Sequence, residues 1–315
     1  MERSIGIDLG GSRIKGALVN RQGSVLKKCT MLTHAKTGPD TVVDQIAGIV
    51  NELMDGFDDI AGLGIGAPGP LDARTGQIYT MPNLPEWENY PLREKLQSRL
   101  KMDVEIMNDA DCAAWGEYLF GVAKEVDNFA LLTLGTGIGS SIFIHGRPWV
   151  GVSGISPEIG HIPISNDAVQ CSCGQYGHVE SFVSAWKMIQ RIRAAICTGA
   201  ETILPVEKFR SGNGEVKDIA EAAAKGDLLA VKELTRYAMF LGRTIGLIAN
   251  LLNLQLIVLT GGIVNSWKLI ETTVWRAINL SSFHIQRSAM KIKIGLNPEN
   301  AGVIGAAAMF LNCRH

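Results

Sequence analysis

Two segments of the chain share one pattern: an apolar run, a glycine-rich turn with a hydroxyl side chain, and a second apolar run. Residues 5–19 read IGIDLGGSRIKGALV, and residues 130–144 read ALLTLGTGIGSSIFI. Each segment predicts two strands joined by a tight turn. Alignment of Leu9 with Leu134 makes the two segments an internal repeat, so we expect two copies of one α/β domain type.

Glycine-rich turns let the backbone come close to an anion, because free amides and a neighbouring hydroxyl donate to phosphate oxygens. Ser12 and Thr136 are the hydroxyls of the two turns, and a third turn, LTGGIV at 259–264, precedes a predicted helix. None of the three fits the phosphate-loop pattern, and GTGIG lacks the following helix of a dinucleotide-binding turn. A hairpin glycine needs no ligand, so plain turn geometry is the alternative.

A cluster of metal-ligand types lies in the middle of the chain. Four such residues fall within eighteen positions: His161, Cys171, Cys173 and His178. Thiolate and imidazole are the ligands that tetrahedral zinc prefers, and a closed four-ligand site fixes a loop rather than performing chemistry. The alternative is a pair of reduced surface thiols beside unrelated histidines. A metal that pins this loop would also orient its flanking carboxylates, Glu158 and Glu180.

Residues 104–121 join a short apolar run to a helical pattern that starts near Asp111, leaving Asn108 and Asp109 at the junction. One of these three residues can cap the helix, which stabilises it by about 1 kcal/mol. An aspartate at a strand end that faces a cleft is well placed to accept a proton from a substrate hydroxyl. Apolar spacing predicts further helices, at 41–55, 184–197, 217–252 and 302–311.

Seven motifs occur in an order that resembles the ROK family of bacterial sugar kinases and repressors, within the actin-like, ribonuclease-H-like ATPase superfamily. They are DLGGSRIKG at 8–16, GAPGPLD at 66–72, PNLPEW at 82–87, NDAD at 108–111, LGTGIG at 134–139, EIGH at 158–161 and the cysteine cluster. The resemblance implies a two-domain α/β fold of the actin-like, ribonuclease-H-like type with an internal duplication. Residues 1–108 would form a small N-terminal domain, residues 109–296 a larger domain with the zinc loop, and a C-terminal helix within 297–315 would pack back on the first.

The resemblance also implies the site residues. Asp109 matches the catalytic base that removes the proton from the 6-hydroxyl of the sugar as that oxygen attacks the γ-phosphate of ATP. The matches to sugar-binding positions are Gly69, Asn83, Asn108, Glu158, His161 and Glu180. The matches to phosphate and magnesium positions are Asp8, Gly10, Gly11, Ser12, Gly135, Thr136 and Gly137. The matches to the adenosine turn are Gly261 and Gly262.

One metal position departs from the family. The usual zinc set is one histidine and three cysteines, whereas His178 stands where the third cysteine is usual. Histidine is a competent ligand, so we expect a structural Zn²⁺ held by two histidines and two cysteines. His161 would then serve twice, with one ring nitrogen on zinc and the other free to reach a sugar hydroxyl.

Composition agrees with this interpretation. The chain has 315 residues, 46% of them hydrophobic, and a formal net charge of −1, so it is long enough for two domains and has no basic surplus to hold nucleic acid. Its scattered cysteines and its lack of a signal-peptide pattern predict a cytoplasmic location. Polar residues interrupt the apolar stretch 245–259, which predicts a buried helix followed by a strand and no membrane partner.

The expected function is ATP-dependent phosphorylation of the 6-hydroxyl of a hexose, with glucose as substrate, Mg²⁺ and structural Zn²⁺ as cofactors, and a homodimer as the assembly. N-acetylmannosamine or N-acetylglucosamine is the alternative substrate, because kinases for these sugars share nearly all of the matched residues. A non-catalytic sugar-sensing regulator is the second alternative. The family's repressors carry a DNA-binding segment ahead of the sugar-binding body, and none is expected in a chain that begins four residues before its first predicted strand.

Overall fold

The computed structural model describes residues 2–81, 84, 86–296 and 300–312. These residues group by contact into two units. The first comprises Met1–Leu131, Ser141–Pro157 and Gly295–His315, and the second comprises Leu132–Ser140 and Glu158–Ile294. The predicted domains, 1–108 and 109–296, are defined from motif positions and not from contacts, and these ranges stay a prediction.

The predicted hairpins and helices are present, except that the helical pattern at 217–252 forms two helices, interrupted at residues 225–227. The strands are β1 (Arg3–Leu9), β2 (Arg13–Asn20), β3 (Val25–Leu32), β4 (Ile60–Ala67), β5 (Leu71–Asp72), β6 (Gln77–Ile78), β7 (Val104–Asn108), β8 (Phe129–Leu134), β9 (Ile138–Ile144), β10 (Arg147–Pro148), β11 (Leu256–Thr260) and β12 (Lys291–Ile294). The α-helices are α1 (Pro39–Met54), α2 (Leu92–Leu100), α3 (Asp109–Phe120), α4 (Ala185–Cys197), α5 (Val206–Arg210), α6 (Val216–Ala224), α7 (Leu228–Leu252), α8 (Trp267–Ser281), α9 (His284–Ala289) and α10 (Ala301–Asn312). The short 3₁₀ helices are η1 (Ala35–Thr37), η2 (Ile159–His161), η3 (Val179–Ser181) and η4 (Gly262–Ser266).

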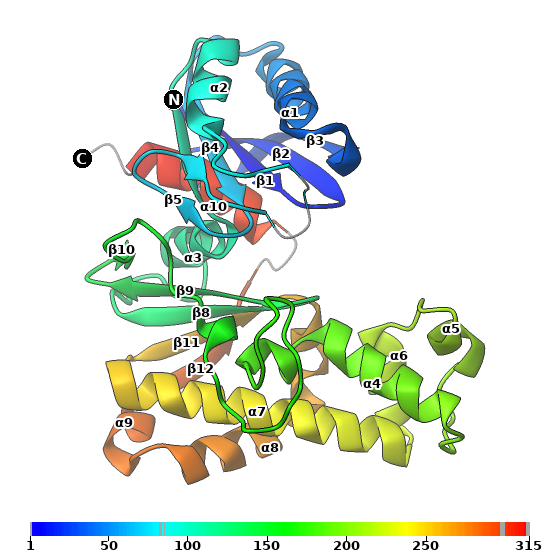
Figure 1. The fold of residues 1–315 in the computed structure, drawn as a ribbon. Coiled ribbons are helices and arrows are strands. Elements are labelled where there is room, and N and C mark those ends of the chain that lie inside the picture. The colour runs from blue at the N-terminus through cyan, green and yellow to red at the C-terminus, as the bar shows by residue number, and fades with distance from the viewer. Residues whose placement is uncertain (1, 82–83, 85, 297–299, 313–315) are drawn as a thin grey trace. The chain divides into compact units, whose positions relative to one another are not determined.

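Two five-stranded sheets share one topology (Figure 1). The first has the order β3-β2-β1-β4-β7, and the second has the order β10-β9-β8-β11-β12. In each sheet, three strands that follow one another in sequence are joined by two later strands that the chain reaches through helices. Leu9 ends β1 and Leu134 ends β8, so the two aligned residues hold the same place in the two sheets. The prediction of an α/β fold with an internal duplication is confirmed.

Helices cover both faces of the first sheet. Ile5 and Ile7 of β1 are fully buried in a core that they share with α1 and α2. Gly6, between them, faces the other way. A Cβ atom on Gly6 would lie 2.0 Å from the carbonyl oxygen of Val303, so glycine lets the backbone of α10 pack directly on the strand. Figure 1 shows α10, in red, against these strands, and α10 also contacts β4 and α3.

The second unit is built around α7 and α8. A Cβ atom on Gly242 of α7 would lie 2.4 Å from the carbonyl oxygen of Val274 of α8, so the two helices approach closely at this point. Arg191 of α4 pairs with Glu233 of α7 at an Nε–Oε2 distance of 2.6 Å, and both side chains are largely buried. Arg191 also donates to the carbonyl oxygen of Ser181 at 3.1 Å. These contacts anchor η3 to α4 and α7.

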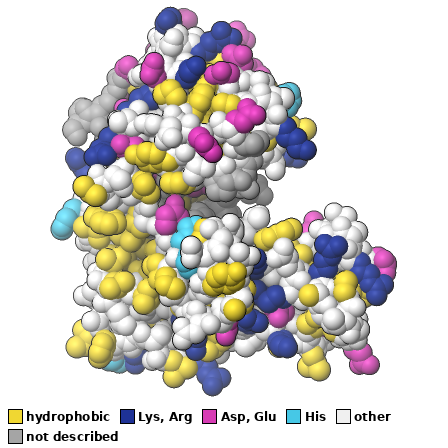
Figure 2. Space-filling view, in the orientation of Figure 1, with side chains coloured by type: hydrophobic (Ala, Val, Ile, Leu, Met, Phe, Trp, Pro, Cys, Tyr) yellow, Lys and Arg dark blue, Asp and Glu magenta, His cyan; other side chains and the backbone are white. Residues whose placement is uncertain are grey.

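The apolar stretch 245–259 is the end of α7 followed by β11, as predicted. Among the described residues, no helix has both the length and the apolar character needed to cross a membrane. On the face shown in Figure 2, lysine and arginine side chains are interspersed with aspartate and glutamate, in keeping with the net charge of −1.

Candidate functional site

Three strands of the first sheet end at one edge, and predicted site residues lie at these strand ends. β1 and β4 run parallel and pair Asp8 with Gly66, while β4 and β7 run parallel and pair Gly66 with Met107. Neighbouring strands lie about 4.8 Å apart, which places Asp8 about 10 Å from the end of β7 with only β4 between them. The structure therefore brings Asp8 to the same sheet edge as Asn108 and Asp109.

Asn108 and Asp109 form the junction between β7 and α3. Asn108 caps α3, because its side-chain oxygen accepts a hydrogen bond from the Ala110 amide at 2.9 Å. Oδ1 of Asp109 accepts from the same amide at 2.8 Å. The helix begins at Asp109, two residues before the predicted start near Asp111. The cap at Asn108 sets the first residue of the helix, whereas the apolar pattern marks only the residues after it.

Asp111 has a different role from the capping role that the sequence left open. It is fully buried, and its two carboxylate oxygens accept hydrogen bonds from two serine hydroxyls. Ser141 Oγ donates to Oδ1 at 2.5 Å, and Ser156 Oγ donates to Oδ2. A buried carboxylate is tolerated only when hydrogen bonds compensate its lost hydration. The two serines were missed in the sequence, since no local pattern marks a contact between segments 30 and 45 residues apart.

Asp8 lies at the end of β1, directly before the first glycine turn. Burial raises the pKa of Asp8, and Lys15, its partner across the β1–β2 pair, opposes this shift more weakly. In the turn, the carbonyl oxygen of Gly10 accepts from the Thr33 hydroxyl at 2.7 Å. The carbonyl oxygen of Ser12 accepts from the Thr33 amide at 3.0 Å. Thr33 thus engages two carbonyl oxygens, the groups that would repel an anion, in the turn that also contains Gly11.

The segment after β4 carries two further predicted sugar-binding positions. Gly69 has a φ of 84°, in the left-handed region that favours glycine. It follows β4 at the same edge of the sheet that carries Asp8. Asn83 lies outside the described residues.

The turn between β8 and β9 contacts the start of α4. The carbonyl oxygen of Gly135 accepts from the Ala185 amide at 2.9 Å, and that of Thr136 accepts from the Trp186 amide at 3.4 Å. A Cβ atom on Gly135 would meet nothing within 4 Å, so the space before this residue is open. Thr136 is exposed.

The third glycine turn lies against the end of β8. Gly261 has a φ of 93°, and a Cβ atom on it would lie 2.3 Å from the carbonyl oxygen of Leu134. A Cβ atom on Gly262 would meet nothing within 4 Å. Because Leu134 directly precedes Gly135, the structure brings the predicted adenosine turn and the second predicted phosphate turn together.

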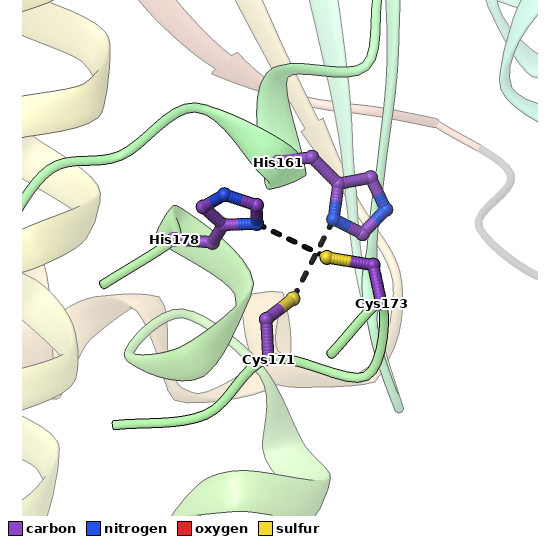
Figure 3. A group of neighbouring side chains, drawn as sticks. All are labelled: His161, Cys171, Cys173 and His178. Atoms are coloured by element: carbon purple, nitrogen blue, oxygen red, sulfur yellow. Dashed lines mark hydrogen bonds between the residues drawn. The ribbon is translucent and has the colours of Figure 1, made fainter. Parts of the chain in front are cut away.

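The four predicted zinc ligands converge (Figure 3). Nδ1 of His161 lies 3.5 Å from Sγ of Cys171, and Nδ1 of His178 lies 3.3 Å from Sγ of Cys173. One ligand atom from each of the four residues lies within 4.8 Å of all the others. Burial raises the pKa of the Cys171 thiol. Two imidazole nitrogens and two sulfurs in one small cluster match the donor set of tetrahedral zinc.

Three predicted sugar-binding residues adjoin this cluster. Nε2 of His161 lies 4.0 Å from Oε2 of Glu158, while its Nδ1 faces Cys171, so the two ring nitrogens point to different partners. Burial raises the pKa of Glu158, His161 lowers it, and the Glu180 carboxylate raises it again.

Glu180 meets the second glycine turn. Its Oε2 accepts from the Ile138 amide at 3.4 Å, and a Cβ atom on Gly137 would lie 2.6 Å from the same oxygen. Its Oε1 accepts from the hydroxyl of Ser172. The structure therefore places Gly137, predicted as a phosphate position, against a predicted sugar ligand. Ser172 was not predicted from the sequence, because a serine between two cysteines has no distinctive signal.

The fold is that of a two-domain α/β protein of the actin-like ATPase type. A model of the ROK family matches residues 4–312, so the chain belongs to the ROK family. The glucokinase of Halalkalibacterium halodurans is 31% identical over 306 residues, which cover 96% of this chain and 92% of that protein. The crystal structure of a ROK family glucokinase from Streptomyces griseus in complex with glucose and AMPPNP matches with a TM-score of 0.84 at 28% identity, covering 98% of each chain. The xylose repressor of Caldicellulosiruptor bescii is 28% identical over 318 residues, which cover 98% of this chain and 78% of the repressor.

Proposed function

We propose that this chain, an ATP-dependent sugar kinase of the ROK family, transfers the γ-phosphate of ATP to the 6-hydroxyl of a hexose, and that the hexose is glucose. The observation that carries the proposal is the shared edge of the parallel strands β1, β4 and β7, where Asp8 lies near the end of β1 and Asp109 follows β7. The similarity to bacterial glucokinases supports glucose as the substrate.

Asp109 is the proposed general base. Phosphoryl transfer needs little covalent chemistry from the protein, mainly a positioned hydroxyl, a base and donors around the triphosphate. Asp109 stands at the first position of α3 and is partly buried, which suits a carboxylate that accepts a proton from a bound sugar. Asp8 supplies the oxygen ligand type that Mg²⁺ prefers, and bound Mg²⁺ would neutralise charge on the phosphates.

The nucleotide is assigned to the three glycine turns. Glycine amides and turn hydroxyls donate to phosphate oxygens, and the open space before Gly135 and Gly262 supports a close approach of the ligand. The proposed phosphate residues are Gly10, Gly11, Ser12, Gly135, Thr136 and Gly137. The proposed adenosine residues are Gly261 and Gly262.

The sugar is assigned to polar groups that accept from or donate to ring hydroxyls. The proposed residues are Gly69, Asn83, Asn108, Glu158, His161 and Glu180. Structural Zn²⁺ on His161, Cys171, Cys173 and His178 would orient Glu158, His161 and Glu180, with the second ring nitrogen of His161 available to the sugar. His178→Cys should keep the metal, whereas His178→Ala should weaken it. A cytoplasmic homodimer is part of the proposal.

Two other activities are tested alongside glucose phosphorylation. N-acetylmannosamine or N-acetylglucosamine kinases differ from glucokinases in the space beside the 2-position of the sugar. A non-catalytic sugar-sensing regulator is the other candidate, and the similarity to a xylose repressor favours it. A regulator would not need Asp109 together with the complete set of phosphate residues.

A coupled ADP-release assay over a panel of hexoses and N-acetylhexosamines separates these candidates. The proposal predicts the highest kcat/KM for glucose. A higher value for an N-acetylhexosamine would replace glucose as the substrate. Binding of sugars without ADP release from any of them would establish the regulator instead.

A further inference from the structure

We propose that Ser172 is a positioning residue for sugar binding, because its hydroxyl holds the Glu180 carboxylate and so links the zinc segment to the sugar. The inference rests on the proposed function, in which Glu180 binds the sugar.

The carboxylate of Glu180 has a donor on each oxygen. The hydroxyl of Ser172 donates to Oε1, and the amide of Ile138 donates to Oε2 at 3.4 Å. One hydrogen bond leaves a carboxylate free to rotate about its last bond, whereas two donors on different oxygens fix its plane. Ile138 starts β9, so one of the donors belongs to the sheet and the other to the zinc segment.

The hydroxyl of Ser172 has one hydrogen and two neighbours that can accept it. Its Oγ lies 3.8 Å from Sγ of Cys171, and the contact to Glu180 is far shorter. Sγ of Cys171 lies 3.7 Å from Oε1 of Glu180. Ser172 Oγ is therefore the nearer of these two donors to Oε1 of Glu180.

The position of Ser172 depends on the metal ligands beside it. Ser172 lies between Cys171 and Cys173, so an ion that fixes both ligands also fixes the intervening backbone. A tight turn assists, because the Cys171 amide donates to the Gln175 carbonyl oxygen at 2.7 Å and the Gly174 amide donates to the Cys171 carbonyl oxygen at 3.1 Å. A fixed backbone at Ser172 thus fixes the position of its hydroxyl, which in turn holds the Glu180 carboxylate.

The test compares sugar kinetics in Ser172→Ala and Ser172→Thr. A hydrogen bond to a charged group supports about a tenfold change in affinity, so Ser172→Ala should raise the sugar KM about tenfold. The kcat should stay within about twofold, because Glu180 holds the sugar alike before and during the reaction. Ser172→Thr keeps the hydroxyl and should restore the wild-type KM. Zinc content should be unchanged in both variants.

Two controls separate positioning from general damage to the loop. Ser165→Ala removes a hydroxyl of the same segment that accepts from the Asp167 amide at 3.1 Å, and it should leave the sugar KM unchanged. In a Glu180→Ala background, Ser172→Ala should add no further increase in KM, because the group that it positions is gone.

An active wild type with the same sugar KM in Ser172→Ala would overturn this inference alone. Loss of zinc in Ser172→Ala, or failure of Ser172→Thr to restore the KM, would overturn it in favour of a purely structural role. A wild-type protein that phosphorylates no hexose would overturn both the proposed function and this inference.

Discussion

The two sheets have one strand order but different residues at equivalent strand ends. Asp8 in β1 aligns with Thr133 in β8, one position before the leucine that ends each strand. Burial raises the pKa of Asp8 beside Lys15, whereas the Thr133 hydroxyl accepts from the Gly139 amide at 3.0 Å and closes its own hairpin. The first copy thus keeps a carboxylate where the second uses a neutral side chain for local structure.

In the second copy, the predicted site carboxylates lie outside the strand ends. Glu158 and Glu180 belong to the segments around the histidine–cysteine cluster and not to the strand ends. The comparison teaches that duplication supplies a scaffold twice, while the chemistry of each copy depends on a few side chains placed on it. The first sheet would supply the carboxylates for the base and for Mg²⁺, and the zinc segment of the second unit would orient the carboxylates that bind the sugar.

The largest expected effect comes from the end of β7. Asp109→Asn keeps the shape and the hydrogen bond to Ala110 but cannot accept the 6-hydroxyl proton, so kcat should fall at least about 10²-fold. The sugar KM should change little, because asparagine keeps the hydrogen-bonding capacity of this position. Steady-state kinetics with glucose and ATP measure both. Turnover near the wild-type rate would remove Asp109 from its proposed role and weaken the contrast between the two copies.

The next effect tests the aligned pair Asp8 and Thr133. Asp8→Asn should lower kcat/KM about tenfold and raise the Mg²⁺ concentration needed for half-maximal rate, since it removes a charge from the proposed phosphate site. Thr133→Val should leave the Mg²⁺ dependence unchanged and cost only hairpin stability. Equal Mg²⁺ dependence in both variants would contradict a special role for Asp8.

Asp8→Asn should raise the stability of the fold, although it lowers kcat/KM. Because burial raises the folded-state pKa of Asp8, its contribution to stability is present at low pH and is lost as pH rises through that pKa. Asp8→Asn should therefore be more stable than wild type at neutral pH, with the difference shrinking as pH falls. Thermal unfolding of apo protein across pH measures this. A less stable variant at neutral pH would contradict the sign.

The smallest effects come from two glycines of one turn. A Cβ atom on Gly137 would lie 2.6 Å from Oε2 of Glu180, so Gly137→Ala should displace that carboxylate and raise the sugar KM about threefold. A Cβ atom on Gly135 would meet nothing within 4 Å, so Gly135→Ala should fold normally and raise the ATP KM instead. If both variants raise the KM of the same substrate, Gly137 and Gly135 do not act on different substrates, and this prediction is wrong.

Much of this arrangement could be predicted from local sequence. The glycine turns indicated both hairpins, because tight turns have strong residue preferences. The ligand types at His161, Cys171, Cys173 and His178 indicated the cluster that the structure brings together. These features are encoded within a few residues of one another.

Long-range contacts could not be predicted in this way. The buried bonds from Ser141 and Ser156 to Asp111 depend on how segments 30 and 45 residues apart pack. The contact of Ser172 with Glu180 spans eight residues and depends on how the loop between them folds. Hydroxyl residues are common at surfaces, so their types alone give no signal of such partners.

The division between the two copies is tested most directly by titrating glucose and a non-hydrolysable ATP analogue into Asp109→Asn and Cys171→Ser by calorimetry. Wild-type protein should contain about one zinc per chain, and Cys171→Ser should lose it. Asp109→Asn should bind glucose like wild type, whereas Cys171→Ser should bind glucose at least about tenfold more weakly and the analogue with little change. Zinc-free Cys171→Ser that binds glucose with wild-type affinity would contradict the account.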